Sequence, residues 1–137
     1  MVWATVCRPA HPLLSEVLDL AAHRLRVNIE IKGRDLRGDG IEEEIARMIR
    51  DRGLQQEVLI SSFNPAVLIR MRRIAPELSC GLLYAPNMPV YLARAWTLPL
   101  TRAAVVHPYY GMVDEQYMYR AHRQGRRVNV WTVKTPQ

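Results

Sequence analysis

The sequence predicts an α/β fold built on a parallel sheet. Along its 137 residues an apolar segment of strand length, a short loop and an amphipathic helix recur in that order. Strands that alternate with helices are joined by right-handed crossovers, which makes the strands parallel. No long Pro- or Gly-rich linker and no close internal repeat interrupts this pattern. We therefore expect one domain over residues 1–137, with five strands.

The first half of the chain holds two predicted helices and the strand between them. Apolar residues at helical spacing predict a helix over Leu13–Leu25, which leads into a strand at Val27–Gly33. A polar, glycine-containing loop covers residues 33–40. The next helix, Ile41–Arg52, has three glutamates in its first turn, where the helix macrodipole favours anions, and Gly53 is placed to end it.

The second half begins with a strand at Glu57–Ser62. Asn64 and Pro65 follow as an N-cap and a proline at the first helical position, and the helix that they start should end before Pro76. The remaining predicted elements are a strand at Gly81–Tyr84, a helix around Val90–Trp96, a strand at Ala103–His107, a helix from about Asp114 to Gln124 closed by Gly125, and a strand at Arg127–Val133.

Charge and composition exclude several classes of protein. The net charge is +6, but the 19 basic residues are spread over every predicted helix. The densest groups, within 70–73 and 123–127, are typical of solvated outer faces, so we expect no nucleic-acid partner and a preference for anionic substrates. No apolar run is long enough to span a membrane, and Met1–Cys7 lacks the basic start of a secretory signal, so we expect a soluble, cytoplasmic chain.

The two cysteines carry no motif. Cys7 and Cys80 are too few and too far apart for a zinc site or a disulfide framework. We expect both to be reduced thiols, with Cys80 packed at the start of a strand.

The segment Val27–Gly33 is the most informative part of the sequence. Asn28, Glu30 and Lys32 share one face of the predicted strand, and three apolar residues share the other. In a strand covered on both sides, a carboxylate and an ammonium on one face need a metal, a substrate or each other. Two interpretations stay open: a functional site, or an edge or antiparallel strand with one wet face.

Other polar residues follow the predicted strand ends. In parallel sheets and barrels, functional groups gather at the carboxyl ends of the strands. The residues expected at this rim are Glu30, Lys32, Ser61, Ser62, Tyr84, His107, Tyr109, Tyr110, Trp131 and Thr132. A nucleophilic role for Ser61 is not favoured, because neither a glycine-flanked elbow nor a following acid and histidine accompanies it.

Several motifs together resemble the glycerophosphodiester phosphodiesterase family. They occur in the family's order and spacing at Pro12–Val17, Asn28–Lys32, Leu59–Phe63, Ala75–Leu78 with Gly81–Leu83, and Gly125–Val133. Each is weak alone. The resemblance implies a (β/α)₈ barrel that hydrolyses glycerophosphodiesters to an alcohol and glycerol 3-phosphate with a divalent cation.

The resemblance also implies roles for individual residues. Glu30 is expected to be a ligand of Mg²⁺ or Ca²⁺, and Lys32 to act in catalysis and substrate binding by neutralising the phosphate. Trp131 is expected to wall the glycerol side of the pocket, although packing at the barrel rim explains it equally well. His107 is an expected substrate-binding residue, with a hydrogen bond to a neighbouring loop as the alternative.

The departures from the family pattern lead to further expectations. Residues 1–11 have no counterpart of the family's His-Arg-Gly motif, its glutamate and aspartate pair or its second histidine, and Lys134–Gln137 have none of its last strand. The chain should then be a partial TIM barrel, with about five consecutive βα units that match the third to seventh strands of eight. We expect little phosphodiesterase activity from the chain alone, and self-association through open barrel edges.

Three classes of function stay open on the sequence. The chain is part of an enzyme of this family, a non-catalytic remnant or subunit that binds phosphate-bearing ligands, or an unrelated small α/β binding domain.

Overall fold

A computed structural model describes residues 11–33, 38–89 and 97–132, and in this part of the chain five strands form one sheet. All of the neighbouring strands are parallel, and their order in the sheet is their order in the sequence. The strands are β1 Val27–Glu30, β2 Val58–Ser62, β3 Ser79–Tyr84, β4 Val105–Pro108 and β5 Arg127–Val128. The predicted α/β class and the predicted strands are therefore confirmed.

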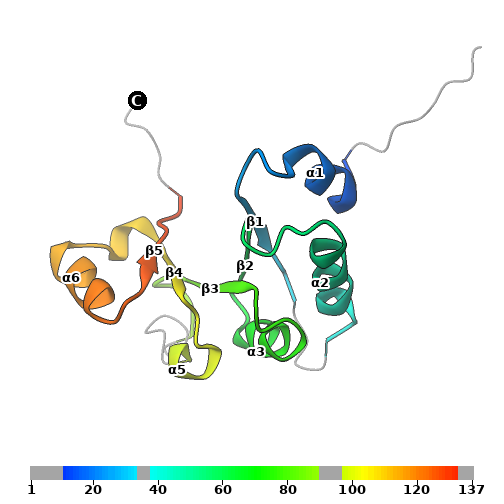
Figure 1. Cartoon of the computed structure of the whole chain (residues 1–137). Coiled ribbons are helices and arrows are strands. Elements are labelled where there is room, and N and C mark those ends of the chain that lie inside the picture. Colours follow the sequence, from blue (N-terminus) through cyan, green and yellow to red (C-terminus); the bar gives the residue numbers. More distant parts are fainter. Residues whose placement is uncertain (1–10, 34–37, 90–96, 133–137) are drawn as a thin grey trace, which may run out of the picture.

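The helices lie outside a curved sheet, so that the whole has the shape of an open half-barrel (Figure 1). They are α1 Leu14–Ala21, α2 Ile41–Asp51, α3 Pro65–Ile74, α5 Leu98–Thr101 and α6 Glu115–Arg123, with a 3₁₀ turn, η1, at Tyr110–Met112. Sequential parallel strands with helices on the outer side alone are the arrangement of a (β/α) barrel.

The hydrophobic core fills the space between the sheet and these helices. Alternate strand residues supply one side of it, including Ile60, Leu82 and Val106, and the helices supply the other side with residues such as Ile49 and Met71. Because strand side chains alternate between faces, the remaining strand residues lie on the concave face. That face holds the candidate site.

Local signals in the sequence set several helix boundaries as predicted. The Asn64 side chain accepts a hydrogen bond from the backbone N–H of Ala66 at 2.9 Å, which caps α3. Asp114 Oδ1 accepts one from the N–H of Tyr117 at 2.6 Å, which caps α6. Gly125 follows α6 with a φ of 66°, a conformation that glycine adopts without strain.

Other boundaries differ from the prediction. Helix α1 ends at Ala21 rather than Leu25, because His23 turns the chain with a φ of 56°. The carboxylate of Glu57 fixes this turn. It accepts a hydrogen bond from the backbone N–H of His23 at 2.9 Å, and it makes a second hydrogen bond with the Nδ1 atom of His23 at 2.8 Å. Helix α5 and the 3₁₀ turn were not predicted. The helix predicted at Val90–Trp96 lies outside the described residues.

The last strand is also shorter than predicted. Regular pairing with β4 covers Arg127–Val128 alone, and Trp131 then makes an isolated bridge with Tyr109. The final predicted strand residue, Val133, is outside the described part of the chain.

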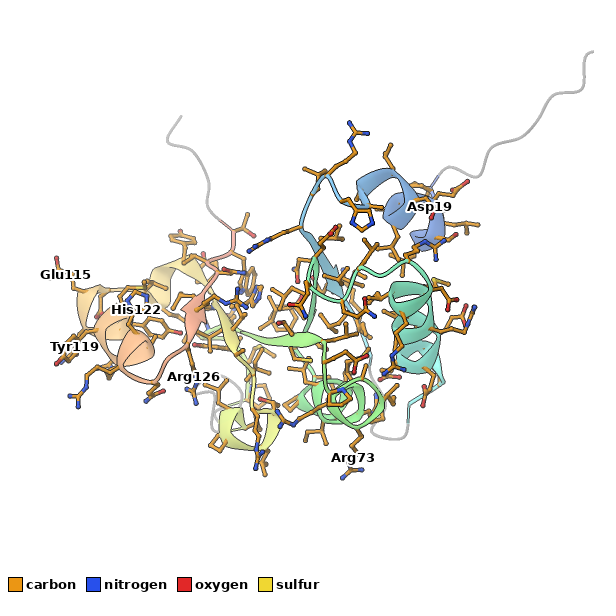
Figure 2. The ribbon with its side chains drawn as sticks, in the orientation of Figure 1. Asp19, Arg73, Glu115, Tyr119, His122 and Arg126 are labelled. Atoms are coloured by element: carbon orange, nitrogen blue, oxygen red, sulfur yellow. The ribbon has the colours of Figure 1, made fainter. Side chains whose placement is uncertain are left out.

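Two predictions about surface and interior residues can be compared with the structure. Cys80 is buried near the start of β3, as predicted, and burial raises the pKa of its thiol to about 11. Arg73 projects outward from α3 into solvent, also as predicted (Figure 2). Arg70 does not: its side chain is 17% exposed and pairs with the buried Glu42, so the prediction of a solvated face is wrong there.

Within the described ranges, no helix has the length and apolar character needed to cross a membrane.

Candidate functional site on the concave face

A row of paired residues crosses the concave face obliquely, from the carboxyl end of β1 to the amino end of β4. Glu30 of β1 pairs with Ser61 of β2, Ser61 with Gly81 of β3, and Gly81 with Val105 of β4. Side chains paired in a parallel register point to the same face of a sheet. The register therefore places Glu30 in the row that these residues form.

Glu30 and Lys32 both lie on strand β1 or directly after it, at the edge of the described sheet. Both side chains are exposed, whereas Ile29 and Ile31 between and beside them are buried. The two charged residues are two positions apart, so they share a face with roughly 6 to 7 Å between them. The predicted two-faced strand is confirmed, and its charged face is open to solvent as the wet-edge interpretation requires.

His107 is buried on the concave face of β4, with 5% of its surface exposed. Its imidazole lies over Gly81, where an added Cβ would be 2.6 Å from Nε2, so a side chain at position 81 would displace the ring. Burial lowers the pKa of His107 and favours the neutral imidazole. Nε2 makes no hydrogen bond with the described residues, so the alternative of a bond from Nε2 to a neighbouring loop is not seen.

Trp131 belongs to an aromatic cluster at the carboxyl ends of the strands. Its Nε1 donates a hydrogen bond to the backbone carbonyl of His107 at 2.8 Å. Its ring meets Phe63 edge-on at 5.3 Å between centroids and Tyr109 at 5.6 Å. Phe63 follows β2 and Trp131 follows β5, so this contact spans the rim above β3 and β4. Trp131 packs at the rim and stays partly exposed, which leaves a contact with substrate open.

Two residues expected at the rim face the other side of the sheet. The Tyr84 hydroxyl hydrogen-bonds to the hydroxyl of Tyr117 on α6, and burial raises the pKa of Tyr84. The Ser62 hydroxyl donates to the carbonyl of Ile31 at 2.7 Å and accepts from the N–H of Asn64 at 3.1 Å. Both therefore have structural roles, and the expectation that they belong to the site is corrected. Strand alternation puts them opposite Ser61 and Leu83.

Gly33 and Gly38 lie next to side chains of α3 that the sequence did not reveal as their neighbours. Arg70 of α3 donates to the buried Glu42 of α2 through Nη2 at 2.5 Å and Nε at 2.9 Å. A Cβ at Gly38 would lie 2.8 Å from Arg70 Nε, and one at Gly33 would lie 2.7 Å from Val67 Cγ2. Gly33 and Gly38 therefore both lie close against α3. Residues 28 positions apart make this ion pair, and no local pattern marks them as partners.

The described residues fit a divalent cation only in part. No group of three or more His, Cys, Asp or Glu side chains is placed to hold a metal within them. A hard cation such as Mg²⁺ or Ca²⁺ takes about six or more oxygen ligands, several from carboxylates. Glu30 offers one exposed carboxylate on the concave face, which is not a complete metal site.

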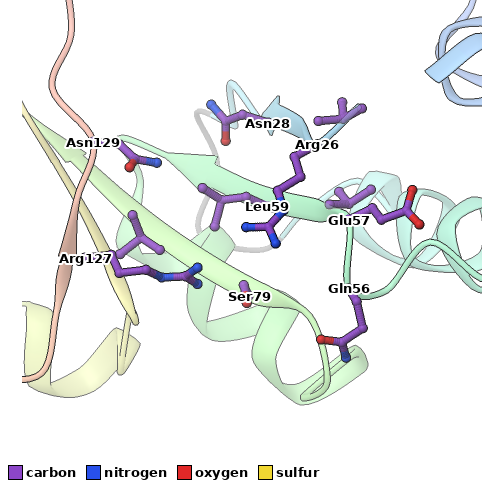
Figure 3. A pocket seen from close by; sticks show the side chains of 11 residues that line it. Arg26, Asn28, Gln56, Glu57, Leu59, Ser79, Arg127 and Asn129 are labelled. Carbon is purple, nitrogen blue, oxygen red and sulfur yellow. The ribbon is translucent and has the colours of Figure 1, made fainter. Parts of the chain in front are cut away.

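The amino-terminal half of the concave face is hollowed by a pocket of about 430 Å³ (Figure 3). Arg26, just before β1, and Arg127 of β5 line it from the two edges of the sheet, and Asn28 and Ser79 lie between them. It is at the opposite end of the strands from Lys32. This pocket was not predicted from the sequence, because its lining residues come from segments that lie far apart along the chain.

The family of the chain follows from comparison with known proteins. The model of the glycerophosphoryl diester phosphodiesterase family matches residues 6–137. The chain belongs to this family. The resemblance noted in the motifs is thereby confirmed, and an unrelated α/β binding domain is excluded.

Curated relatives agree with this assignment. The chain is 33% identical over 124 residues to a glycerophosphodiester phosphodiesterase of Caldanaerobacter subterraneus, and the match covers 89% of the chain and 49% of that protein. It is 35% identical over 74 residues to one from Bacillus altitudinis, covering 53% of the chain and 30% of the relative. The chain thus spans about half the length of the first relative.

Solved structures give the same fold. A putative glycerophosphoryl diester phosphodiesterase from Silicibacter pomeroyi superposes with a TM-score of 0.73 at 26% identity, covering 88% of this chain and 45% of that one. One from Agrobacterium tumefaciens gives a TM-score of 0.75 at 19% identity, covering 92% and 53%. In both cases about half of the larger structure is matched, in agreement with the predicted partial barrel.

Proposed function

We propose that the chain forms part of a glycerophosphodiester phosphodiesterase, which hydrolyses glycerophosphodiesters to an alcohol and glycerol 3-phosphate. The observation that carries the proposal is the placement of Glu30 and Lys32 on the concave face of β1, at its carboxyl end, in a chain of this family. A structurally similar phosphodiesterase from Oleispira antarctica, with a TM-score of 0.60, was solved in complex with the product sn-glycerol-3-phosphate. A phosphate-bearing substrate is consistent with that neighbour.

The proposed role of Lys32 is electrostatic. Its ammonium group stands at the open edge of the sheet and makes no ion pair with the described residues. A lysine in this position attracts the phosphodiester and offsets charge that develops on the phosphoryl oxygens. Removing the charge should weaken both binding and turnover.

Glu30, His107 and Trp131 have proposed roles beside Lys32. Glu30 supplies one carboxylate toward a divalent cation, and the other ligands have to come from outside the described residues. His107, whose pKa is lowered by burial, offers a neutral imidazole on the same face as Glu30. Trp131 offers an apolar wall at the rim for the glycerol carbons.

The experiment that tests this proposal is hydrolysis of glycerophosphocholine with Mg²⁺, Ca²⁺ or Mn²⁺. We expect the 137-residue chain alone to be nearly inactive, because one carboxylate does not hold the cation tightly. A longer polypeptide that includes the rest of a barrel should turn over, and Lys32→Met in it should abolish most of the activity. Ordinary turnover by the 137-residue chain would contradict the first expectation, and full activity of K32M would contradict the role of Lys32.

A second candidate function is binding of phosphate-bearing ligands without catalysis. The exposed ammonium of Lys32 favours it, since binding through a charge does not require the metal ligands that are missing from the described residues. The two candidates differ in one observation. Translating the genomic sequence upstream of Met1 should reveal an in-frame His-Arg-Gly motif and carboxylate pair if the chain is part of an enzyme, and neither if it is a non-catalytic remnant.

A further inference from the structure

Two buried polar atoms on the concave face have no hydrogen-bond partner among the described residues. They are Ser61 Oγ and His107 Nε2. Ser61 is 0% exposed and His107 is 5% exposed, so bulk water does not satisfy either group. A buried hydroxyl or imidazole without a partner has lost its hydrogen bonds to water and gained none in their place, which destabilises the folded chain. Such groups in folded proteins are normally paired with protein or with ordered water.

The register brings the two atoms to the same glycine. Ser61 is the direct partner of Gly81 on β2, and both residues face the concave side. From the other neighbouring strand, His107 leans over Gly81 so closely that a Cβ there would lie 2.6 Å from Nε2 and 2.7 Å from Cδ2. Adjacent strands are about 4.8 Å apart, so Ser61 Oγ and His107 Nε2 approach one region above β3 from opposite sides.

We propose that Ser61 Oγ and His107 Nε2 bind one shared buried water molecule above Gly81. A buried water typically has about two to four polar partners. The hydroxyl and the imidazole supply two of them, and Gly81, which has no Cβ, lets the imidazole lie close against β3 with Nε2 on the side of Ser61. The water connects β2 to β4 across β3.

Ser61 is then a positioning residue that acts through His107. The neutral imidazole has two tautomers, which differ in whether Nε2 carries the proton. A water fixed by Ser61 selects one of these tautomers and holds the ring over Gly81. Glu30 pairs with Ser61 in the register, so the water site adjoins the part of the concave face that carries the charged residues. This inference concerns the folded chain and does not rest on the proposed function.

A double-mutant cycle in the full chain tests the shared site. Ser61→Ala should lower the folding equilibrium constant about tenfold, because the water and His107 lose a partner. In the background of His107→Leu the same change should have little effect, because the site is already lost. Ser79→Ala, on the same face but at the amino end of β3, is the matched control and should change little. An S61A variant as stable as the unaltered chain, or effects of S61A and H107L that simply add, would overturn the proposal.

A second measurement does not depend on stability. The ¹⁵N chemical shifts of the His107 imidazole report the hydrogen bonding of Nε2. Ser61→Ala should move the Nε2 shift while Ser79→Ala leaves it in place. An Nε2 shift that S61A does not move would mean that Ser61 has a packing role alone, and the proposal would fall.

Discussion

Glu42 of α2 and Arg70 of α3 form a buried ion pair. Glu42 Oε1 accepts two hydrogen bonds from the Arg70 guanidinium, at 2.5 Å and 2.9 Å, and the Glu42 side chain is 1% exposed. The pair joins α2 to α3 and lies against Gly38 of the loop. The ion pair thus connects the two outer helices and fixes the side chain that lies next to Gly38.

Removing one member of this pair should destabilise the chain strongly. Glu42→Ala leaves the Arg70 guanidinium without its buried carboxylate, and breaking a buried pair in this way costs about 3–5 kcal/mol. The free energy of unfolding in urea measures the effect. Glu44→Ala is the control, because the pair of Glu44 with Arg47 is exposed and should contribute little. An E42A variant no less stable than E44A would contradict the structural role of the pair.

A side chain at Gly38 should disturb the same contact. Gly38 has a φ of 80°, and an added Cβ would lie 2.8 Å from Arg70 Nε, which Glu42 holds in place. Gly125 also has a positive φ, 66°, but nothing lies within 4 Å of its added Cβ. Left-handed backbone strain of about 1–2 kcal/mol applies to both alanine variants. Thermal unfolding should therefore show a larger loss for Gly38→Ala than for Gly125→Ala, and equal losses would mean that the clash with Arg70 is absent.

The sequence predicted features that depend on neighbouring residues. The caps at Asn64 and Asp114 are local signals, and the alternation of apolar and charged residues around Glu30 is read directly from the chain. These signals work because a cap or a strand face is decided within a few residues. The parallel sheet then followed from the order of the elements.

The features that the sequence did not predict depend on contacts between distant residues. Glu42 was interpreted as one of three glutamates that the helix macrodipole favours in a first turn, and its burial depends on an arginine 28 positions away. The orientation of Tyr84 toward α6 follows from its partner, Tyr117. The approach of His107 to Gly81 needs the register of β3 and β4. None of these three features can be predicted without knowing how distant parts of the chain pack together.

His107 should give the stability a pH dependence in a defined window. Burial lowers its pKa, so between the lowered value and about 6.5 the unfolded chain binds more protons than the folded chain. Stability should therefore fall as the pH is lowered below about 6.5. The carboxylate of Glu57, whose pKa is lowered by its hydrogen bonds with His23, loses its contribution at lower pH, below about 4.5.

Urea unfolding between about pH 5 and pH 7 measures this effect. His107→Leu removes the titrating group, so the slope of stability against pH in this window should become shallower than in the unaltered chain. The same slope in both proteins would show that His107 does not titrate differently in the folded and unfolded states.

Within the described sheet β1 is an edge strand, and its outer edge should promote self-association of the 137-residue chain. The N–H groups of Val27 and Ile31 donate to the carbonyls of Glu57, just before β2, and Ser61, at 2.9 Å and 2.8 Å. Strand alternation therefore turns the N–H of Asn28 toward the outer edge. Unpaired edges of parallel strands are templates for pairing with another chain. Asn28→Pro should weaken association without breaking the β1–β2 ladder, because edge strands tolerate proline. Light scattering that shows a stable monomer over a wide concentration range would contradict this expectation.

Binding of glycerol 3-phosphate to the 137-residue chain tests the central claim most directly, because it isolates the role of Lys32 from catalysis. We expect calorimetry to detect binding that Lys32→Met weakens about tenfold or more, the loss expected for one charge-assisted contact. Arg127→Met removes a positive charge from the same concave face at the opposite end of the strands, and should leave the affinity nearly unchanged. Equal affinities of the unaltered chain and K32M, or no binding by the unaltered chain, would contradict the account.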